Sequence, residues 1–409
     1  LSSLILQSAL DKKGVVKMNQ TQFYAPTRVI FGADTEKQIG DIIANYGYKK
    51  VLIHYGGQSA LRSGLIDHVK QSLISKKIDF VELGGVVPNP VLSLVYQGIT
   101  LAKTEKVDFI LAIGGGSVID SAKAIGYGAA NEQDVWDYYS TSALPQACLP
   151  IGTILTIAAA GSEMSNSSVI TNEAGNLKRG CGSDLSRPLF SIMDPVLTLT
   201  LPDYQTAAGC VDIMMHTMER YFNHGDNLEL TDAISESLLR VVKKNALLLA
   251  KEPQNLAARG EVMWASSLSH NGLTGFGTDG GDFATHKIEH ELSGMFDVTH
   301  GAGLAVVWPN WARYVFKERL ERFVQFAVNV MDVEPCADAE ETALKGIHAM
   351  ENFYHALKMP TNLKELGLNP TEAELQEMAE KCDYRPDGTI GIVKKLAVSD
   401  VYAILKCSR

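Results

Sequence analysis

Short apolar runs and helix-spaced apolar positions mark out the first half of the chain. Four runs have the length of buried strands and are rich in branched and aromatic residues: 51–55, 80–83, 109–113 and 150–156. Glycines follow the first three runs. Apolar side chains at the spacing of a helix face occupy residues 33–46 and 64–76. Repeated strand, glycine turn and helix predict an α/β fold in which a parallel sheet carries helices on its faces.

The second half of the chain is helical in pattern nearly throughout, from about Leu201. One apolar stripe at helical spacing is formed by Leu230, Ile234, Leu238, Val241 and Val242. Residues 371–374, Thr-Glu-Ala-Glu, have the capping-box pattern that opens a helix. This half of the sequence has no convincing strand run, so we predict an all-α C-terminal part.

Length, charge and cysteine usage narrow the class of protein. The 409 residues exceed one ordinary core, which favours two domains. A net charge of -10 would repel a phosphate backbone, so we expect no nucleic-acid partner. No apolar run in the sequence is long enough to span a bilayer, so we expect no membrane partner. The six cysteines are scattered without a C-x-x-C pair, which indicates reduced thiols and a cytoplasmic protein.

The third predicted strand runs into a glycine turn, Gly114, Gly115 and Gly116, and then into a helix. Glycines let backbone N–H groups approach a ligand, and a helix N-terminus adds unpaired donors and a positive dipole end. A diphosphate fits such a turn, with Ser117 capping the helix and Asp120 completing an S-x-x-D pattern. The alternative is a tight, well-capped turn without a ligand, because the sequence is not a G-x-G-x-x-G fingerprint.

The residues after the first predicted strand bear on which dinucleotide would bind. An NAD site often places a carboxylate against the ribose 2′-hydroxyl. Here the sequence continues with Gly56, Gly57, Gln58 and Ser59, and Arg62 follows. Small residues, a hydroxyl and a cation can accommodate a 2′-phosphate. We therefore expect NADP(H) in preference to NAD(H).

Several histidines and one aspartate have the spacing of a metal site. Asp212 and His216 lie four residues apart, as do His286 and His290, so each pair shares one face of a helix. His300 follows, which gives five candidate ligands for four places. A carboxylate with several imidazoles suits one divalent transition metal, for which we expect Fe²⁺ or Zn²⁺.

The spacing alone leaves part of the ligand set open. It does not separate His286 from His290, and Glu289 competes with both. The remaining histidines are expected to be packed or surface residues: His54, His68, His224, His270, His348 and His355.

A dinucleotide and a metal on one chain favour hydride transfer over hydrolysis. The main alternative is a zinc metallohydrolase, because residues 286–290 match the H-x-x-E-H pattern, in which Glu289 would activate a zinc-bound water. That function has no use for the glycine turn, for Asp212 or for His216. A metal-stabilised structural or storage protein is a third class, but structural sites favour cysteine-rich closed shells.

Six motifs in a fixed order give the chain a family resemblance. They are Pro-Thr-Arg-Val-Ile-Phe-Gly at 26–32, Pro-Asn-Pro at 88–90, the turn at 114–120, Gly-Ser-Glu-Met at 161–164, Asp212-x-x-x-His216, and the stretch 281–300. From Gln22 to its C-terminus the chain resembles the iron-dependent (group III) alcohol dehydrogenases, in particular their NADP(H)-dependent butanol dehydrogenase branch.

The resemblance implies which residues form the metal site. By match to the family, the ligands fall on Asp212, His216, His286 and His300. His290 matches a position beside the site, where it would relay a proton to solvent or support a ligand.

The resemblance also implies the cofactor site and the architecture. The diphosphate-binding turn falls on residues 114–117, with Asp120 in the same motif, and Thr153, Thr156 and Ser162 match positions near the cofactor. The implied fold is a Rossmann-like α/β domain followed by a helical domain, with the site in the cleft between them. Homodimers are common in the family, so we expect one here.

These inferences divide the chain into a leader or upstream extension at 1–17, an α/β dinucleotide-binding domain at 18–199 and a helical metal-binding domain at 200–409. The expected partner is a small primary alcohol or aldehyde, with hydride passing to or from NADP(H). The chain departs from many relatives at Ala158 and Ala160, where they have proline and threonine. It also has Phe283 where tryptophan is usual.

Overall fold

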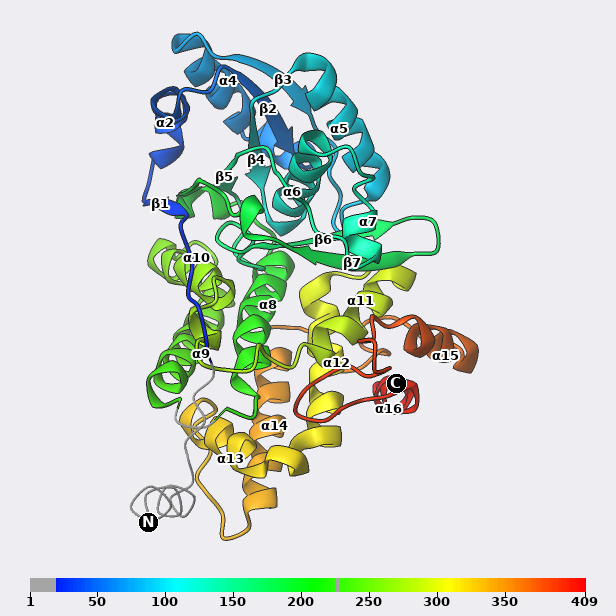
Figure 1. Cartoon of the computed structure of the whole chain (residues 1–409). Helices are drawn as coiled ribbons and strands as arrows, with labels where there is room; N and C mark the ends of the chain where they lie inside the picture. The colour runs from blue at the N-terminus through cyan, green and yellow to red at the C-terminus, as the bar shows by residue number, and fades with distance from the viewer. Residues whose placement is uncertain (1–19, 226–227) are drawn as a thin grey trace, which may run out of the picture.

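The computed structural model describes residues 20–225 and 228–409, with the side chains of Gln58 and Ser59 left out. The predicted leader, 1–17, therefore lies outside the described residues. Figure 1 shows two parts, a sheet flanked by helices and a bundle of helices, with a small two-stranded ribbon between them. Within the described residues, no helix is both long and apolar enough to cross a membrane.

The sheet has six parallel strands in the order β1-β8-β5-β4-β2-β3. Its strands are β1 (Arg28–Phe31), β2 (Lys50–Tyr55), β3 (Asp79–Leu83), β4 (Phe109–Gly114), β5 (Ile151–Leu155) and β8 (Phe190–Met193). The central strand β4 is buried along its whole length, as the continuous apolar run predicts. The α/β fold class and the four predicted strands are confirmed.

Helices cover both faces of this sheet. They are η1 (Thr35–Gln38), α2 (Ile39–Tyr46), α3 (Gln58–Arg62), α4 (Leu65–Ser75), α5 (Leu92–Glu105), α6 (Gly116–Ala130) and α7 (Asp137–Ser140). Successive residues of a strand point to opposite faces. Leu52 accordingly packs in the core beneath α5 and α6, whereas Val51 and Ile53 pack in a separate core with α2 and α4.

An antiparallel ribbon, β6 (Ser167–Asn172) with β7 (Leu177–Gly182), lies outside the main sheet. It packs between α6 on one side and α11 on the other. The sequence pattern did not predict this ribbon, because polar residues and glycines make up most of its two strands. The ribbon links the sheet part to the helices that carry the metal-site residues. The short 3-10 helix η2 (Asp184–Ser186) follows the ribbon, and η3 (Pro195–Thr198) follows β8.

The rest of the chain is helical, as predicted. Its elements are α8 (Asp203–Tyr221), α9 (Glu229–Leu249), α10 (Leu256–His270), η4 (Leu273–Gly275), α11 (Ala284–Phe296), α12 (His300–Val315), η5 (Phe316–Arg319), α13 (Leu320–Asn329), α14 (Ala339–Ala356), α15 (Glu372–Lys381) and α16 (Val398–Cys407). The capping box of Thr371 and Glu374 is present at the start of α15.

The apolar stripe predicted for α9 is wrong at its first residue. Leu230 is 74% exposed. The first turns of α9 instead bury Thr231 and Ser235, whose hydroxyls donate to backbone carbonyls. Because those hydroxyls are satisfied, the buried face can begin with polar residues and continue with Leu238 and Val242.

Candidate active site

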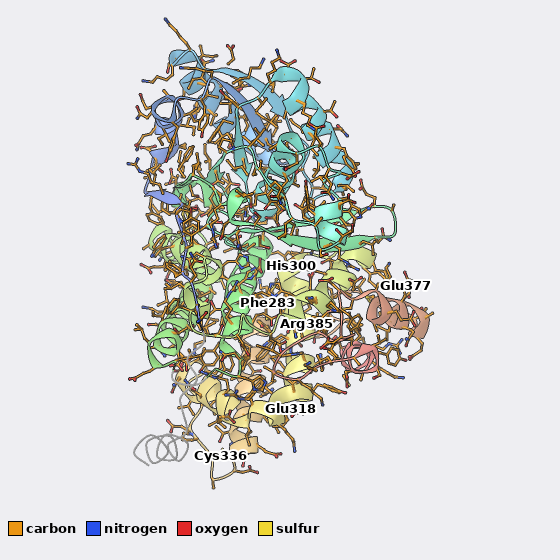
Figure 2. All side chains as sticks on the ribbon, viewed as in Figure 1. Phe283, His300, Glu318, Cys336, Glu377 and Arg385 are labelled. Atoms are coloured by element: carbon orange, nitrogen blue, oxygen red, sulfur yellow. The ribbon has the colours of Figure 1, made fainter. Side chains whose placement is uncertain are left out.

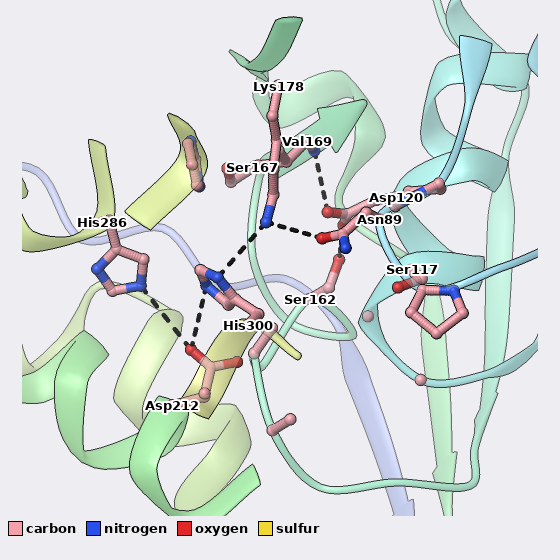
Figure 3. Close-up of a pocket in the computed structure, with 18 of the residues that line it drawn as sticks. Asn89, Ser117, Asp120, Ser162, Ser167, Val169, Lys178, Asp212, His286 and His300 are labelled. Carbon is pink, nitrogen blue, oxygen red and sulfur yellow. Dashed lines mark hydrogen bonds and ion pairs between the residues drawn. The ribbon is translucent and has the colours of Figure 1, made fainter. Parts of the chain in front are cut away.

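Three helices bring the four predicted metal ligands to one point. Asp212 and His216 lie one turn apart on α8, His286 lies on α11, and His300 is the first residue of α12. The Nε2 atoms of His216, His286 and His300 lie 3.4, 3.8 and 3.8 Å from Asp212 Oδ1. The last two approaches are drawn in Figure 3.

This donor set fits a divalent cation. Asp212 Oδ1 and His286 Nε2 are buried and have no hydrogen-bond partner among the described residues. Two ligands bound tetrahedrally at about 2.1 Å lie about 3.4 Å apart, close to the observed separations. A buried carboxylate oxygen surrounded by imidazole nitrogens is costly without a partner, and a cation between them would satisfy these atoms together.

A close contact between two helices sets the position of His300. A Cβ atom on Gly301 would lie only 2.0 Å from the carbonyl oxygen of Ala208. The start of α12 therefore lies directly against the backbone of α8, four residues before Asp212. Only glycine allows that approach.

Two buried glutamates orient the ligand rings. Glu219 on α8 accepts from the backbone N–H of His286 at 3.0 Å and from its Nδ1 at 3.1 Å. Glu289 pairs with Nδ1 of His300 and accepts from Ser293. In both cases the bond to Nδ1 leaves Nε2 free to face the metal site.

Glu289 acts on His300 and is not itself among the atoms around Asp212. Burial alone raises its pKa, but the neighbouring His300 and Lys178 lower the pKa of Glu289 to about 2, so the carboxylate stays ionised. Lys178, from β7, lies 3.5 Å from Glu289 Oε2 and donates to Asn89 Oδ1 at 2.9 Å. Glu289 is fully buried, which places it poorly for the water activation required of a metallohydrolase.

Two residues on the other side of the metal site, His270 and Arg220, were not predicted from the sequence. His270 was expected to be a packed or surface residue, but it lines the same cavity, with its ring centroid 3.9 Å from that of His216. Arg220 donates to Nδ1 of His270 at 3.3 Å and lies over the ring of Phe283. Arginine has no acceptor, so Nε2 of His270 carries the ring proton. Nothing in the spacing of His270 or Arg220 marks them in the sequence.

One cavity of about 480 Å³ joins the metal site to the glycine turn. Gly115, Gly116 and Ser117 line one end, and the four predicted ligands with Phe283 line the other. Figure 2 places His300 and Phe283 where the helical part meets the sheet part, and Figure 3 shows the cavity wall with Asp120 and Ser162. The cavity therefore reaches from the metal site to the glycine turn.

The glycine turn has a different cap from the predicted one. Helix α6 begins at Gly116 with Gly115 as its N-cap, and no side chain caps it. Asp120 accepts from the hydroxyl of Ser162 at 2.6 Å and from the backbone N–H of Val169 at 2.9 Å. The predicted Ser117 cap is wrong, because Gly115 adopts an extended conformation and leaves the first N–H groups of α6 open toward the cavity.

Of the other predicted cofactor residues, Thr153, Thr156, Gly56 and Gly57 are not among the residues that line the cavity. Thr153 is fully buried in the sheet, where its hydroxyl donates to Ser191 at 2.7 Å. The backbone N–H of Thr156 bonds to the carbonyl of Gly114, which ends β4 behind the turn. Gly56 and Gly57 follow β2 at the neighbouring strand end. The side chain of Ser59 lies outside the described part of the structure.

His290 lies on α11 beside the predicted ligands. Its half-buried ring lines the cavity, with centroids 5.8 Å from the ring of His300 and 6.4 Å from that of His286. Its role as a proton relay or as a support for a ligand stays a prediction. A His290→Ala variant that keeps full activity at every pH would contradict the relay.

Comparison with known proteins identifies the family. The model of the iron-containing alcohol dehydrogenase family matches residues 26–195, and that of the family's C-terminal domain matches residues 206–408. The chain belongs to the iron-containing alcohol dehydrogenase family. It is therefore an oxidoreductase of alcohols and aldehydes, in a family that uses a metal and a nicotinamide cofactor, and the hydrolase alternative is not favoured.

Individual members resemble this alcohol dehydrogenase over nearly its whole length. A probable NADH-dependent butanol dehydrogenase 1 of Bacillus subtilis is 41% identical over 96% of this chain and 100% of its own. The NADPH-dependent aldehyde reductase YqhD of Escherichia coli is 34% identical over 86% of this chain and 90% of its own. The crystal structure of NADH-dependent butanol dehydrogenase A from Thermotoga maritima superimposes with a TM-score of 0.91, at 39% identity, over 96% of this chain and 99% of that one.

Proposed function

We propose that this enzyme transfers a hydride between NADP(H) and a small primary alcohol or aldehyde, with a divalent metal held by Asp212, His216, His286 and His300. One observation supports this most: the four-residue donor set opens into a cavity whose other end is the glycine turn. A site for an oxygen and a site for a dinucleotide thus share one cavity.

The residues around the cavity have separable roles. A divalent cation, when bound, supplies Lewis-acid activation of the substrate oxygen, and the nicotinamide coenzyme supplies or accepts the hydride. Glu219 and Glu289 hold the rings of His286 and His300 with Nε2 toward that cation. The N–H groups at the start of α6 would bind the diphosphate.

The lining of the cavity favours a small, largely apolar substrate. Phe283 gives it an apolar surface near the metal site, and Val87 and Pro88 also line the cavity. Ala160 also lines the cavity, so the hydroxyl that many relatives carry at this position is missing. Short aliphatic alcohols and aldehydes fit this environment, because burial of their carbon chain against an apolar wall is favourable.

The preference for NADP(H) rests on the end of β2. Gly56 and Gly57 follow that strand without a carboxylate, and a Cβ atom on Gly57 would meet nothing within 4 Å. This open space beside a small residue leaves room for a 2′-phosphate. The relatives differ in the coenzyme that their names give: the butanol dehydrogenases are called NADH-dependent, and YqhD is called NADPH-dependent. Homodimer formation and a cytoplasmic location also stay predictions.

An absorbance assay tests the proposal. The enzyme, loaded with Fe²⁺ or Zn²⁺, is mixed with butanal and with NADPH or NADH in parallel, and the loss of the reduced-coenzyme band is followed. We expect oxidation of coenzyme, faster with NADPH, in the wild type and in Asp203→Asn, an exposed aspartate on the same helix. Asp212→Asn should be inactive. If neither NADPH nor NADH is oxidised with any of several aldehydes, the proposal is wrong.

A further inference from the structure

Lys123 is a lysine buried in the interior of the sheet part, with no exposed surface. It lies on α6, the helix that follows the glycine turn. A buried ammonium group is costly unless every proton finds an acceptor, so its surroundings need an explanation. It does not line the cavity, and neither the predicted metal site nor the proposed chemistry uses it.

One loop supplies all the hydrogen-bond acceptors of Lys123. We call residues 162–167, which lead into β6, the serine loop. Nζ donates to the carbonyl and the hydroxyl of Ser162 at 2.8 and 2.9 Å. It also donates to the carbonyl of Ser165 at 3.0 Å, its hydroxyl at 3.3 Å and the carbonyl of Ser167 at 2.7 Å. These five neutral oxygens enclose the ammonium group, so the loop is wrapped around it.

The other side of the serine loop is a wall of the cavity. Ser162, Ser165 and Ser167 all line it, next to Asp120 and the glycine turn. Asp120 reaches the same loop from α6 through the hydroxyl of Ser162. The polar wall facing a bound dinucleotide is thus fixed from behind by Lys123.

The remaining contacts of the loop hold different residues. Glu163 accepts from Ser267 of α10 at 2.5 Å, and the carbonyl of Met164 accepts from Arg187 at 2.8 Å. These bonds anchor the loop to the core but do not reach the serines that face the cavity. Asp120 also holds the hydroxyl of Ser162, and Ser167 pairs with Gly182 in the ribbon. Lys123 is the side chain that bonds to Ser162, Ser165 and Ser167 together.

We propose that Lys123 is a positioning residue for coenzyme binding: it holds the serine loop in the shape against which the dinucleotide binds. The inference rests on the proposed function, because it takes a nicotinamide coenzyme as the occupant of this half of the cavity. The hydrogen bonds of Lys123 go to the serine loop and reach none of the four predicted metal ligands. Loss of Lys123 should thus weaken coenzyme binding and leave metal binding unchanged.

The test measures the two kinds of binding separately. Lys123→Gln and the control Lys244→Gln, an exposed lysine of α9, are loaded with Co²⁺. We expect the visible Co²⁺ spectrum and the metal dissociation constant of both variants to match the wild type. The dissociation constant for NADPH, measured by fluorescence titration, should rise at least about tenfold in Lys123→Gln only. In Lys123→Ala, added methylammonium should restore part of the affinity by filling the vacated space.

A measurement on the unaltered enzyme covers the case in which these variants fail to fold. Burial lowers the pKa of Lys123 to about 8, while Asp120 and Glu163 oppose that shift. Arg187 and Cys148 also face the amine. As the pH rises through about 8, Lys123 loses the proton that binds the loop, and its lone pair faces oxygen atoms. The dissociation constant for NADPH should therefore increase above about pH 8.

The outcomes separate this inference from the proposed function. Unchanged coenzyme affinity in a folded Lys123→Gln variant, or no change in wild-type affinity from about pH 7 to about pH 9.5, would overturn the role of Lys123. Equal loss of Co²⁺ and NADPH binding would also overturn it, since it would mean a general collapse of the fold. A wild type that binds neither NADPH nor NADH would instead overturn the proposed function.

Discussion

At the scale of residues, the metal site consists of ligands and of the groups that aim them. Sequence spacing made Asp212 and His216 candidates, because they lie four residues apart, and His300 joined them as the histidine that follows the second pair. It could not choose between His286 and His290, since both lie on the same face of α11. That choice depends on Glu219, which comes from another helix and holds His286. The resemblance to a family, not the spacing, pointed to His286.

The orienting role of Glu219 gives a first prediction. Glu219→Gln replaces the anion that accepts from His286 by a neutral amide. Metal affinity should fall by about 10- to 100-fold, because the ring loses its orientation and part of its basicity. Competition with a coloured chelator measures the change. Glu261→Gln, at an exposed position of α10, is the control and should bind metal as the wild type does. Equal affinities for the two variants would refute the role of Glu219.

His54 in β2 gives a second prediction, on stability against pH. It is fully buried, with Nδ1 bonded to the carbonyl of Leu83 and Nε2 to Ser121. Burial lowers its pKa to about 4. The unfolded chain takes up a proton near pH 6.5, whereas the folded chain does not, so stability falls as the pH drops from about 6.5 to about 4.

Between about pH 7.5 and about pH 5, His54 alone should cost about 2 kcal/mol of unfolding free energy. Urea unfolding at both pH values measures it. His54→Gln should lose less stability over this interval than the wild type by that amount. His68→Gln, at an exposed position of α4, should lose as much as the wild type. An unchanged pH dependence in His54→Gln would contradict the prediction.

At the scale of elements, the sequence predicted the repeated strands and helices of the α/β part but not its short or polar strands. β2, β4 and β5 were found because buried parallel strands are continuous apolar runs. β1 and β8 were missed because each has only four residues, and the ribbon of β6 and β7 because its residues are largely polar. Short length and polar composition leave too few apolar positions in these strands for a local pattern to reveal them.

The contact of α12 with α8 gives a prediction at this scale. Gly301→Ala would bring a methyl group to 2.0 Å from the carbonyl of Ala208, so the two helices must separate. We expect a loss of about 2 kcal/mol of unfolding free energy. Metal affinity should decline as well, since His300 is the adjacent residue. Gly182→Ala, where an added Cβ meets nothing within 4 Å, is the control. Urea unfolding and chelator competition that give the same values for both variants would refute this account.

At the scale of the whole molecule, metal binding should contribute to stability. The ligands come from α8, α11 and α12, so a cation would link helices across the C-terminal part. A metal present at about 1,000 times its dissociation constant adds about 4 kcal/mol. Removal by a chelator should then lower Tm by about 10 °C in calorimetry. An unchanged Tm, with metal loss verified by elemental analysis, would contradict this prediction.

The order of strands in the sheet has a consequence for how the protein is made. β1 pairs with β8 in register Arg28 to Phe190, so its only neighbour in the sheet is the last strand of that sheet to be translated. During synthesis on the ribosome, β2, β3, β4 and β5 can pair with one another while β1 is still unpaired. Bringing two strands together that are distant in the chain costs conformational entropy before their contacts can form. The nascent chain therefore carries β1 (Arg28–Phe31) unpaired until β8 (Phe190–Met193) has been made, which makes β1 a natural binding site for chaperones.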